Sequence, residues 1–445
     1  MPSINKAEPS WTSSGLDFLV CLDRSGRGFG AALQQAVRDA IRSGRLQPGH
    51  PVPSTRALAS DLGVARGTVV EAYEQLIAVG WLVARQGAAT RVAHLPPAPP
   101  VPAEPSAVPA PRHDLRPGHA DPSSFPRQAW AAAMRRILAE APDEAFGYAD
   151  PHGRAELRAA LAGYLGRARA VHATAATVQV CAGAGHGLAV RALPCDDLGA
   201  RPSALAGLCA DAAVVTPAHQ YPLGVTLSPR RRAELIAWAC GGGGILIEDD
   251  YDGELRYDRQ PIGALQALDP GRVIYVGTTS KSLAAALRVG WLVVPAELTG
   301  AVADTIRVIN AWPCSLEQLA LARFIESGMF DRHIRQMRVI YRRRRDLLAA
   351  ALARHAPMLQ MAGIAAGGHA LVRMPSDGAD EHEVIMRAAL AGLALDGLTG
   401  YRVGDAAAEP LGPALVIGYG TPAGRSYRAA VAALGDFLHS IYSPG

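Results

Sequence analysis

One lysine stands apart from the other basic residues of this chain. Lys281 lies in residues 274–295, which read IYVGTTSKSLAAALRVGWLVVP, and the only other lysine is Lys6. Every other residue among the 44 lysines and arginines is an arginine. Arginine stays protonated, whereas a partly desolvated lysine can lose its proton and act as a nucleophile. The flanking Gly, Thr, Ser and apolar residues argue against a solvated surface lysine. We therefore interpret Lys281 as a catalytic, Schiff-base lysine.

The residues around this lysine match the needs of pyridoxal phosphate. That cofactor requires an amine for its aldehyde, an acid for its ring nitrogen, a partner for its phenolic oxygen and a phosphate-binding cup. Asp249 follows an apolar run at the carboxyl end of a predicted strand, where side chains of an open α/β sheet point into the ligand crevice. It is the candidate acid, and Tyr251 is the candidate partner of the phenolic oxygen. The candidate phosphate ligands are Thr278, Ser280, Arg288 and the backbone N–H groups of Ala184 and Gly185.

The N-terminal part of the chain predicts three helices and a two-stranded wing. Apolar residues at helical spacing define a first helix, and Ser54 is the predicted N-cap of a second helix that ends at Gly63. A third helix is predicted over residues 66–78. Extended segments follow at residues 81–85 and 90–93. This order is typical of a winged helix-turn-helix.

The segment PSTRALASDLGVARGTVVEAYEQL resembles the DNA-reading domain of GntR-type bacterial regulators. Nine arginines and six acidic residues lie between Ser14 and Val92. The resemblance implies that the third helix enters the major groove of a double-stranded DNA operator. By resemblance, the DNA-contacting residues are Ser54, Arg56, Arg66, Thr68 and Arg85. A small helical domain that binds another protein is the alternative, but an arginine at each helix start and at the wing suits phosphate better.

Composition divides the chain into segments. Residues 94–113 are rich in proline and predict a semi-extended spacer of ~3 Å per residue. After them, helical and extended patterns alternate, as in an α/β domain, with a strand predicted at residues 178–181. A long helical pattern covers residues 317–348, and its arginines are interpreted as a solvated helix face. The predicted boundaries are a flexible tail at 1–13, a DNA-binding domain at 14–93, the spacer at 94–113, and a PLP-binding domain at 114–445 with a small subdomain from about residue 330.

The overall composition is that of a large, mildly basic protein. Net charge is +4 and the hydrophobic fraction is 49%, so the chain can bury a substantial core. Six scattered cysteines without a C-x-x-C pair favour reduced thiols over disulfides or a zinc site. No apolar run is long enough for a membrane span or a signal peptide, so a cytoplasmic location is expected. His369, between glycines and apolar residues, is interpreted as a structural histidine, and no metal is expected.

Two motifs in the larger domain resemble the MocR/GabR family of regulators. They are EDDYDGELRY and YVGTTSKSLxxxLRVG, and they follow the GntR-like segment. Members of that family fuse a winged helix to a fold-type-I aminotransferase-like domain, which is an α/β/α sandwich, and the resemblance extends from about Phe29 to the C-terminus. It implies a homodimer. It also implies that Gln220 or His219 lies near the phenolic oxygen and that Tyr148 reaches the partner subunit's cofactor phosphate.

The chain departs from the family pattern at three places. Ala285 replaces a proline in the turn after Lys281. After Val190 the sequence omits about one strand–helix–strand unit, whose aromatic residue covers the cofactor ring in the family. Val416 stands where aminotransferases commonly hold an arginine for the substrate carboxylate. The last two departures argue against efficient transamination.

The sequence therefore predicts a PLP-dependent transcription regulator. An amino-acid-like or amine effector is expected to act through aldimine exchange at Lys281 and to change the relative pose of the DNA-binding domains. The alternative is an active PLP-dependent aminotransferase with a tethered DNA-binding domain. A third hypothesis treats the larger domain as a dimer scaffold for a constitutive repressor.

Overall fold

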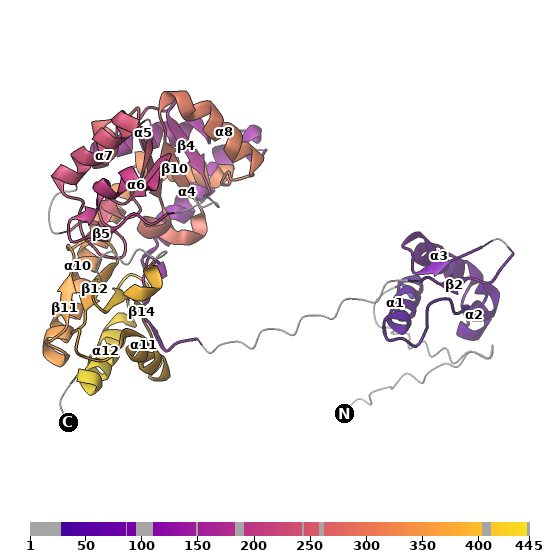
Figure 1. Ribbon diagram of the computed structural model, residues 1–445. Coiled ribbons are helices and arrows are strands. Elements are labelled where there is room, and N and C mark those ends of the chain that lie inside the picture. The colour runs from indigo at the N-terminus through magenta and orange to yellow at the C-terminus, as the bar shows by residue number, and fades with distance from the viewer. Residues whose placement is uncertain are drawn as a thin grey trace. The chain divides into compact units, whose positions relative to one another are not determined.

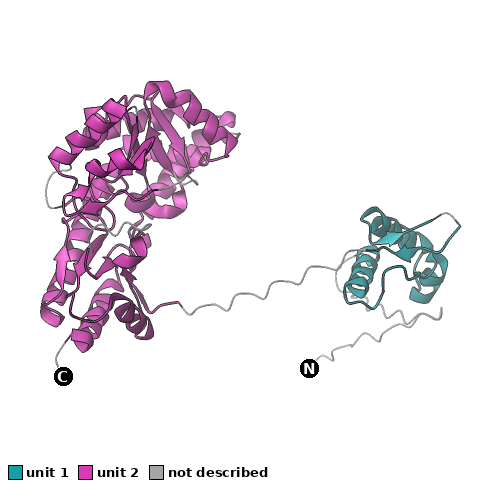
Figure 2. Cartoon of the chain, viewed as in Figure 1, with its two compact units in different colours: residues 1–107 teal, residues 108–445 magenta. Residues whose placement is uncertain are grey.

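The computed structural model describes residues 28–85, 87–94, 110–147, 150–182, 191–242, 244–257, 262–402 and 411–442. It divides the chain into two compact units, residues 1–107 and residues 108–445, which Figure 2 colours teal and magenta. Each unit has its own core of buried apolar side chains. Within the described ranges, no helix is both long and apolar enough to cross a bilayer.

Three helices and a short hairpin form the first unit. The helices are α1 (Phe29–Arg42), α2 (Thr55–Leu62) and α3 (Arg66–Ala78), and the hairpin pairs β1 (Leu82–Val83) antiparallel with β2 (Arg91–Val92) (Figure 1). Apolar residues at helical spacing place one side chain row of each helix in a common core, which includes Leu33, Leu58 and Val69. The predicted winged helix-turn-helix order is confirmed.

Local sequence explains where α2 begins and ends. The Ser54 side chain accepts a hydrogen bond from the backbone N–H of Ala57 at 3.2 Å, which satisfies a donor of the first turn. Gly63 follows the helix with a φ of 64°, a left-handed conformation that glycine adopts without strain. The predicted cap and turn are both confirmed.

A five-stranded sheet lies at the centre of the larger unit. Its order is β4 (Val178–Cys181), β10 (Gly290–Val293), β9 (Val273–Thr278), β8 (Ile245–Asp249) and β7 (Ala212–Val215). Strands β7, β8 and β9 run parallel, whereas β10 is antiparallel to both of its neighbours. Parallel strands place their carboxyl ends at one edge of the sheet, so the residues that follow β8 and β9 lie close together there.

The described part of this sheet ends at β7. Among the described residues, β7 pairs with β8 alone. Its side chains alternate between exposed and buried, and Val214 is 63% exposed. Residues 183–190, where the sequence indicates an omitted unit, lie outside the described residues, and the omission stays a prediction.

Helices and short pairs complete the region around this sheet. The helices are α4 (Arg127–Glu140), α5 (Ala155–Arg169), α6 (Leu205–Leu208), α7 (Pro229–Gly242), α8 (Thr299–Val308) and α9 (Ser315–Glu326) (Figure 1). A hairpin joins β5 (Cys195–Asp196) to β6 (Gly199–Ala200), and β3 (His113–Asp114) runs parallel to β13 (Leu393–Ala394). The β3–β13 pair ties the beginning of the larger unit to its C-terminal part.

A second sheet organises the C-terminal part of the larger unit. Its order is β11 (Gln360–Ala362), β12 (His369–Arg373), β15 (Ala414–Gly418) and β14 (Asp396–Gly397). Helices α10 (Met329–His355), α11 (Glu381–Leu390) and α12 (Tyr427–Tyr442) belong to the same part (Figure 1). Val416 is fully buried in β15 and packs with Leu223 and Leu371. Val416 therefore contributes to the hydrophobic core.

The helical pattern over residues 317–348 forms two helices, α9 and α10, where the sequence suggested one. The break falls at Gly328, whose φ of 70° lies outside the helical region. One arginine of α10 is also buried: Arg344 forms an ion pair with Asp121 and donates to the carbonyl oxygen of Tyr419 at 2.8 Å. The interpretation of the α10 arginines as a solvated face is therefore wrong for Arg344.

Candidate functional site

Two of the acidic residues around the end of β8 are held by structural partners. Glu248 accepts hydrogen bonds from the backbone N–H groups of Leu265 and Gln266, both at 2.8 Å. Asp250 forms an ion pair with Arg169, and each side chain is only 1% exposed. These bonds hold the strand end in one conformation, which is what a preorganised site requires.

The next two acidic residues are held in the same way. The carboxylate of Asp252 pairs with Nδ1 of His219 at 2.8 Å, and both side chains are buried. The hydroxyl of Tyr164 donates to Glu254 at 3.2 Å. Four of the five acids between residues 248 and 254 therefore have structural roles.

Asp249 is the acid that remains. Among the described residues, none donates a hydrogen bond to its carboxylate or forms an ion pair with it. Burial, together with the negative charges of Asp250 and Asp252, raises the pKa of Asp249 to about 6, although Lys281 opposes this shift. A half-buried carboxylate without a partner is suited to receive an N–H group or a cation from a ligand.

Lys281 follows β9 in a π-helical turn, Ser280–Ala284. Its side chain is half-buried, and its ammonium group donates a hydrogen bond to the backbone carbonyl of Gly118. Burial lowers the pKa of Lys281, while the carboxylates of Asp252 and Asp249 oppose the lowering. This direction favours the neutral amine, which is the nucleophilic form.

The three described candidates for phosphate binding flank Lys281. The Thr278 hydroxyl donates to Oγ of Ser280 at 3.0 Å and accepts from the Ser280 backbone N–H at 3.1 Å. Arg288 is exposed and forms no ion pair with the described residues. Its φ of 50° is left-handed, which costs a non-glycine residue about 1–3 kcal/mol and is typical of ligand sites. An unpaired guanidinium beside two hydroxyls suits a phosphate.

The remaining predicted cofactor contacts have mixed outcomes. The Tyr251 hydroxyl donates to the backbone carbonyl of His219 at 3.0 Å, and burial raises the pKa of Tyr251 well above its usual range, so the phenol stays protonated. The Gln220 amide donates to the adjacent carbonyl of Tyr221 at 3.3 Å. Its role at the cofactor stays a prediction. Three further candidates, Tyr148, Ala184 and Gly185, lie outside the described residues.

This donor set fits pyridoxal phosphate. A protonated ring nitrogen requires a free carboxylate, and Asp249 is the acid of its run that lacks a partner among the described residues. The phosphate requires cationic and hydroxyl donors, which Arg288, Thr278 and Ser280 provide. The aldehyde requires an amine of lowered pKa, which Lys281 provides.

Cofactor affinity is expected to fall as the pH drops below about 6. In the predicted site the ionised carboxylate of Asp249 would hold the protonated ring nitrogen, and protonation at a pKa of about 6 would remove that charge. Binding should then weaken by about tenfold per pH unit. Titrations of the cofactor-free protein with pyridoxal phosphate between pH 5 and 8 would measure this inflection, and Asp249→Asn should remove it. Asp304→Asn, on exposed α8, is the matched control, and an unchanged inflection in Asp249→Asn would show that another group titrates.

Sequence reasoning missed the residues that support this site. Arg169 lies 81 positions before Asp250 in the chain, and the partnership of His219 with Asp252 also joins distant segments. The contact of Lys281 with Gly118 involves a backbone carbonyl, which no side-chain pattern in the sequence can indicate. The series of acids in EDDYDGE was the available indication that some of them have structural partners. Adjacent side chains at a strand end point in different directions, so these acids cannot all face one ligand.

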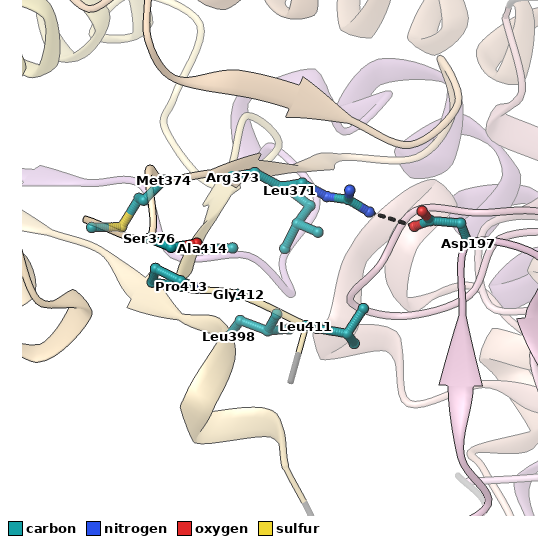
Figure 3. Close-up of a pocket in the computed structure, with 10 residues that line it drawn as sticks. All are labelled: Asp197, Leu371, Arg373, Met374, Ser376, Leu398, Leu411, Gly412, Pro413 and Ala414. Carbon is teal, nitrogen blue, oxygen red and sulfur yellow. Dashed lines mark hydrogen bonds and ion pairs between the residues drawn. The ribbon is translucent and has the colours of Figure 1, made fainter. Parts of the chain in front are cut away.

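A separate cavity of about 300 Å³ lies beside the C-terminal sheet. Figure 3 shows Arg373 of β12 extending toward Asp197, with which it forms an ion pair. Leu371, Leu398 and Leu411 supply apolar surface. None of the predicted cofactor residues lines this cavity, so it is distinct from the site around Lys281.

The first unit presents the predicted DNA-contacting residues at its helix starts and wing. They are Ser54 and Arg56 at α2, Arg66 and Thr68 at α3, and Arg85 after β1. The three arginines are exposed and form no ion pair with the described residues. Nε of Arg66 lies 3.4 Å from the Thr55 hydroxyl oxygen. Exposed guanidinium groups at the starts of α2 and α3 and at the wing suit phosphate and base edges, and these contacts stay predictions.

The chain is similar to two families and to curated regulators. Residues 30–92 match bacterial regulatory proteins of the gntR family, and residues 118–196 and 205–381 match aminotransferase class I and II. The HTH-type pyridoxine biosynthesis transcriptional regulator PdxR of Corynebacterium glutamicum is 33% identical over 380 residues, which cover 76% of this chain and 82% of PdxR. The probable rhizopine catabolism regulatory protein MocR of Rhizobium meliloti is 31% identical over 413 residues, with coverage of 80% and 83%.

Solved aminotransferases share the fold of the larger unit. An archaeal alanine:glyoxylate aminotransferase superposes with a TM-score of 0.67 at 21% identity, covering 76% of this chain and 92% of its own. The α-aminoadipate aminotransferase LysN of Thermus thermophilus gives a TM-score of 0.64 at 20% identity, covering 74% and 92%. These similarities confirm the predicted fold-type-I architecture.

Proposed function

This chain belongs to the MocR-type family, in which a GntR winged helix is fused to an aminotransferase class I and II domain, and we propose that its larger unit senses an amino acid or another amine. As a member of this family, the chain is a DNA-binding transcription regulator, and the aminotransferase fold of the larger unit implies pyridoxal phosphate as cofactor. The proposal adds that DNA binding responds to the amine. The observation that carries it is the carboxylate of Asp249, which has no partner among the described residues and lies within the electrostatic influence of Lys281.

Each residue of the site has a defined task in this proposal. When bound, the cofactor supplies a reactive aldehyde and an electron-accepting ring. Lys281 tethers it, and Asp249 holds a proton on its ring nitrogen. Tyr251 donates to the phenolic oxygen, while Arg288, with Thr278 and Ser280, binds the phosphate. An effector amine would compete with the Lys281 amine for the cofactor, and Lys281 is the group whose contacts would then change.

A true aminotransferase with a tethered DNA-binding domain is the alternative. The sequence places Val416 where an arginine for the substrate carboxylate is common, and this side chain is fully buried among apolar residues. The site therefore lacks a charged group at that position. Repeated turnover with a keto-acid acceptor would favour the enzyme, whereas a single conversion that stalls favours the sensor.

We further propose a cytoplasmic homodimer. DNA-binding regulators act where the chromosome lies, and the family fold supports this location. In a dimer, each of the two winged helices would be joined to its own larger unit by the predicted spacer at residues 94–113, which suits an operator with two half-sites. Sedimentation of the full chain would test the dimer, and a monomer at micromolar concentration would contradict it.

Operator binding with and without amines tests the sensing proposal. A site selected from random DNA by the full chain would serve as the probe, because the selection itself identifies a sequence that the winged helix binds. In cofactor-loaded protein, the cognate amine should change operator affinity, and in Lys281→Ala it should not. Unchanged affinity across the common amino acids and simple amines would contradict sensing while leaving DNA binding intact.

Arg66→Ala is expected to remove sequence-specific DNA binding. If Arg66 contacts a base edge, its loss costs about 1–3 kcal/mol of discrimination, while weak non-specific binding survives. Titrations with the selected site and with scrambled DNA at fixed salt would measure both affinities. Arg45→Ala removes the same charge from the turn after α1 and is the matched control. Equal losses on both DNAs would show that Arg66 contacts only phosphate, and no loss on either would exclude it from the interface.

A further inference from the structure

Two histidines and an aspartate converge in the interior of the larger unit. His219 follows β7, Asp252 follows β8, and His369 begins β12. All three are buried, with exposed fractions of 2%, 3% and 5%. One potential ligand atom from each residue lies within 4.8 Å of those from the other two. These separations are within reach of the distances between ligand atoms around a single ion after small side-chain rotations.

The hydrogen bond of His219 leaves one ring nitrogen free. Its Nδ1 lies 2.8 Å from the carboxylate of Asp252, so Nδ1 carries the proton and Nε2 carries a lone pair. This Nε2 is buried and has no hydrogen-bond partner among the described residues. A carboxylate on the far nitrogen is the arrangement that orients metal-binding histidines.

His369 repeats the arrangement. It forms a hydrogen bond with the backbone of Pro222, which offers only a carbonyl acceptor. Because Nε2 of His369 is buried and has no partner among the described residues, this bond belongs to Nδ1. The ring centres of His219 and His369 are 4.9 Å apart with planes inclined by 37°. Two lone-pair nitrogens therefore lie in one dry region, which is costly without a ligand.

A glycine preserves the space around this group. Gly367 has a φ of 63°, and a Cβ there would lie 2.1 Å from the Asp252 carboxylate and 2.8 Å from Cε1 of His219. Any side chain would displace both residues. The backbone thus favours the packing of the aspartate against the histidine ring.

We propose that Nε2 of His219 and Nε2 of His369 bind a divalent transition metal such as Zn²⁺ or Co²⁺, with Asp252 orienting the His219 ring. Imidazole nitrogens are donors of borderline softness, which suit these ions better than they suit Mg²⁺ and Ca²⁺. The sequence-based interpretation of His369 as a structural histidine then changes. This group adjoins the cofactor site, because the Tyr251 hydroxyl donates to the backbone carbonyl of His219, but metal binding there requires neither pyridoxal phosphate nor DNA.

Cobalt binding to the full chain tests the site. Tag-free protein stripped of metal and cofactor should bind one Co²⁺ per chain, with visible d–d absorption and no near-ultraviolet thiolate band. His219→Gln and His369→Gln should each weaken binding by more than tenfold, and Asp252→Asn by about 10- to 100-fold. His382→Gln, which removes an exposed histidine of α11, is the matched control. Circular dichroism checks that each variant is folded.

Three results would overturn the proposal. They are failure of the folded protein to bind Co²⁺ or Zn²⁺ at micromolar concentration, a thiolate band that assigns the metal to cysteine, and unchanged affinity in both histidine variants. Pulsed electron paramagnetic resonance of Cu²⁺-loaded wild type requires no substitution. Coupling to two imidazole rings supports the site even where a variant fails to fold, and absence of imidazole coupling contradicts it.

Discussion

Lys281→Ala is expected to abolish covalent attachment of pyridoxal phosphate. The amine of Lys281 is the group that can bond to the aldehyde, and burial lowers its pKa toward the nucleophilic form. Borohydride reduction of the loaded protein makes such a bond permanent, so peptide mass spectrometry can locate it. Wild type should carry the added mass on the peptide that contains residue 281, with a visible absorbance band before reduction. The variant should show neither.

The composition of the chain gives this experiment an internal control. The only other lysine, Lys6, lies in the N-terminal segment, so Lys6→Ala removes the same group and should keep the band and the added mass. Binding of the selected DNA site by the winged helix should survive in both variants. Wild type that stays colourless at saturating cofactor, or modification of Lys6 in place of Lys281, would contradict the assignment.

Arg169→Ala is expected to cost the larger unit about 3–5 kcal/mol of unfolding free energy. The guanidinium donates to both carboxylate oxygens of Asp250 at 2.6 and 3.0 Å, and the Tyr275 hydroxyl donates to the same carboxylate at 2.7 Å. Removing the arginine leaves a buried negative charge with a single neutral donor. Denaturant unfolding, followed by a signal from the larger unit, would measure the loss.

An exposed ion pair provides the comparison for this substitution. Arg136 pairs with Glu140 on α4, and both side chains are 56% exposed, so Arg136→Ala should cost less than about 1 kcal/mol. Replacing both buried partners, as Arg169→Met with Asp250→Leu, should recover much of the stability, because no charge is left unpaired. A loss below about 1 kcal/mol for Arg169→Ala alone would show that water or a neighbour compensates the aspartate.

The sequence was sufficient for features that depend on neighbouring residues. The Ser54 cap, the Gly63 turn and the β4 strand at residues 178–181 all follow from local chemistry, and the structure contains each of them. Asp249 was likewise identifiable, because it ends an apolar run. Strand β8 nevertheless continues through this residue, since pairing with β9 extends the strand beyond its apolar segment.

Features that depend on distant partners were not predictable. The sequence gives no indication that Arg169 meets Asp250, or that Arg344 of an arginine-rich helix is buried against Asp121. The pairing of His219 with Asp252 and its approach to His369 likewise require three segments to fold together. Local sequence patterns indicate the chemistry of a site, whereas tertiary contacts determine which of several similar side chains are available to bind a ligand.

The edge strand β7 also bears on how the protein can be handled. Its four residues, Ala212–Val215, carry no charge or proline, and among the described residues only β8 pairs with them. Natural proteins usually protect such edges with lysine, proline or a bulge, because unpaired backbone groups template association with other chains. In concentrated solutions, folded molecules are therefore expected to aggregate through β7 well before the protein unfolds.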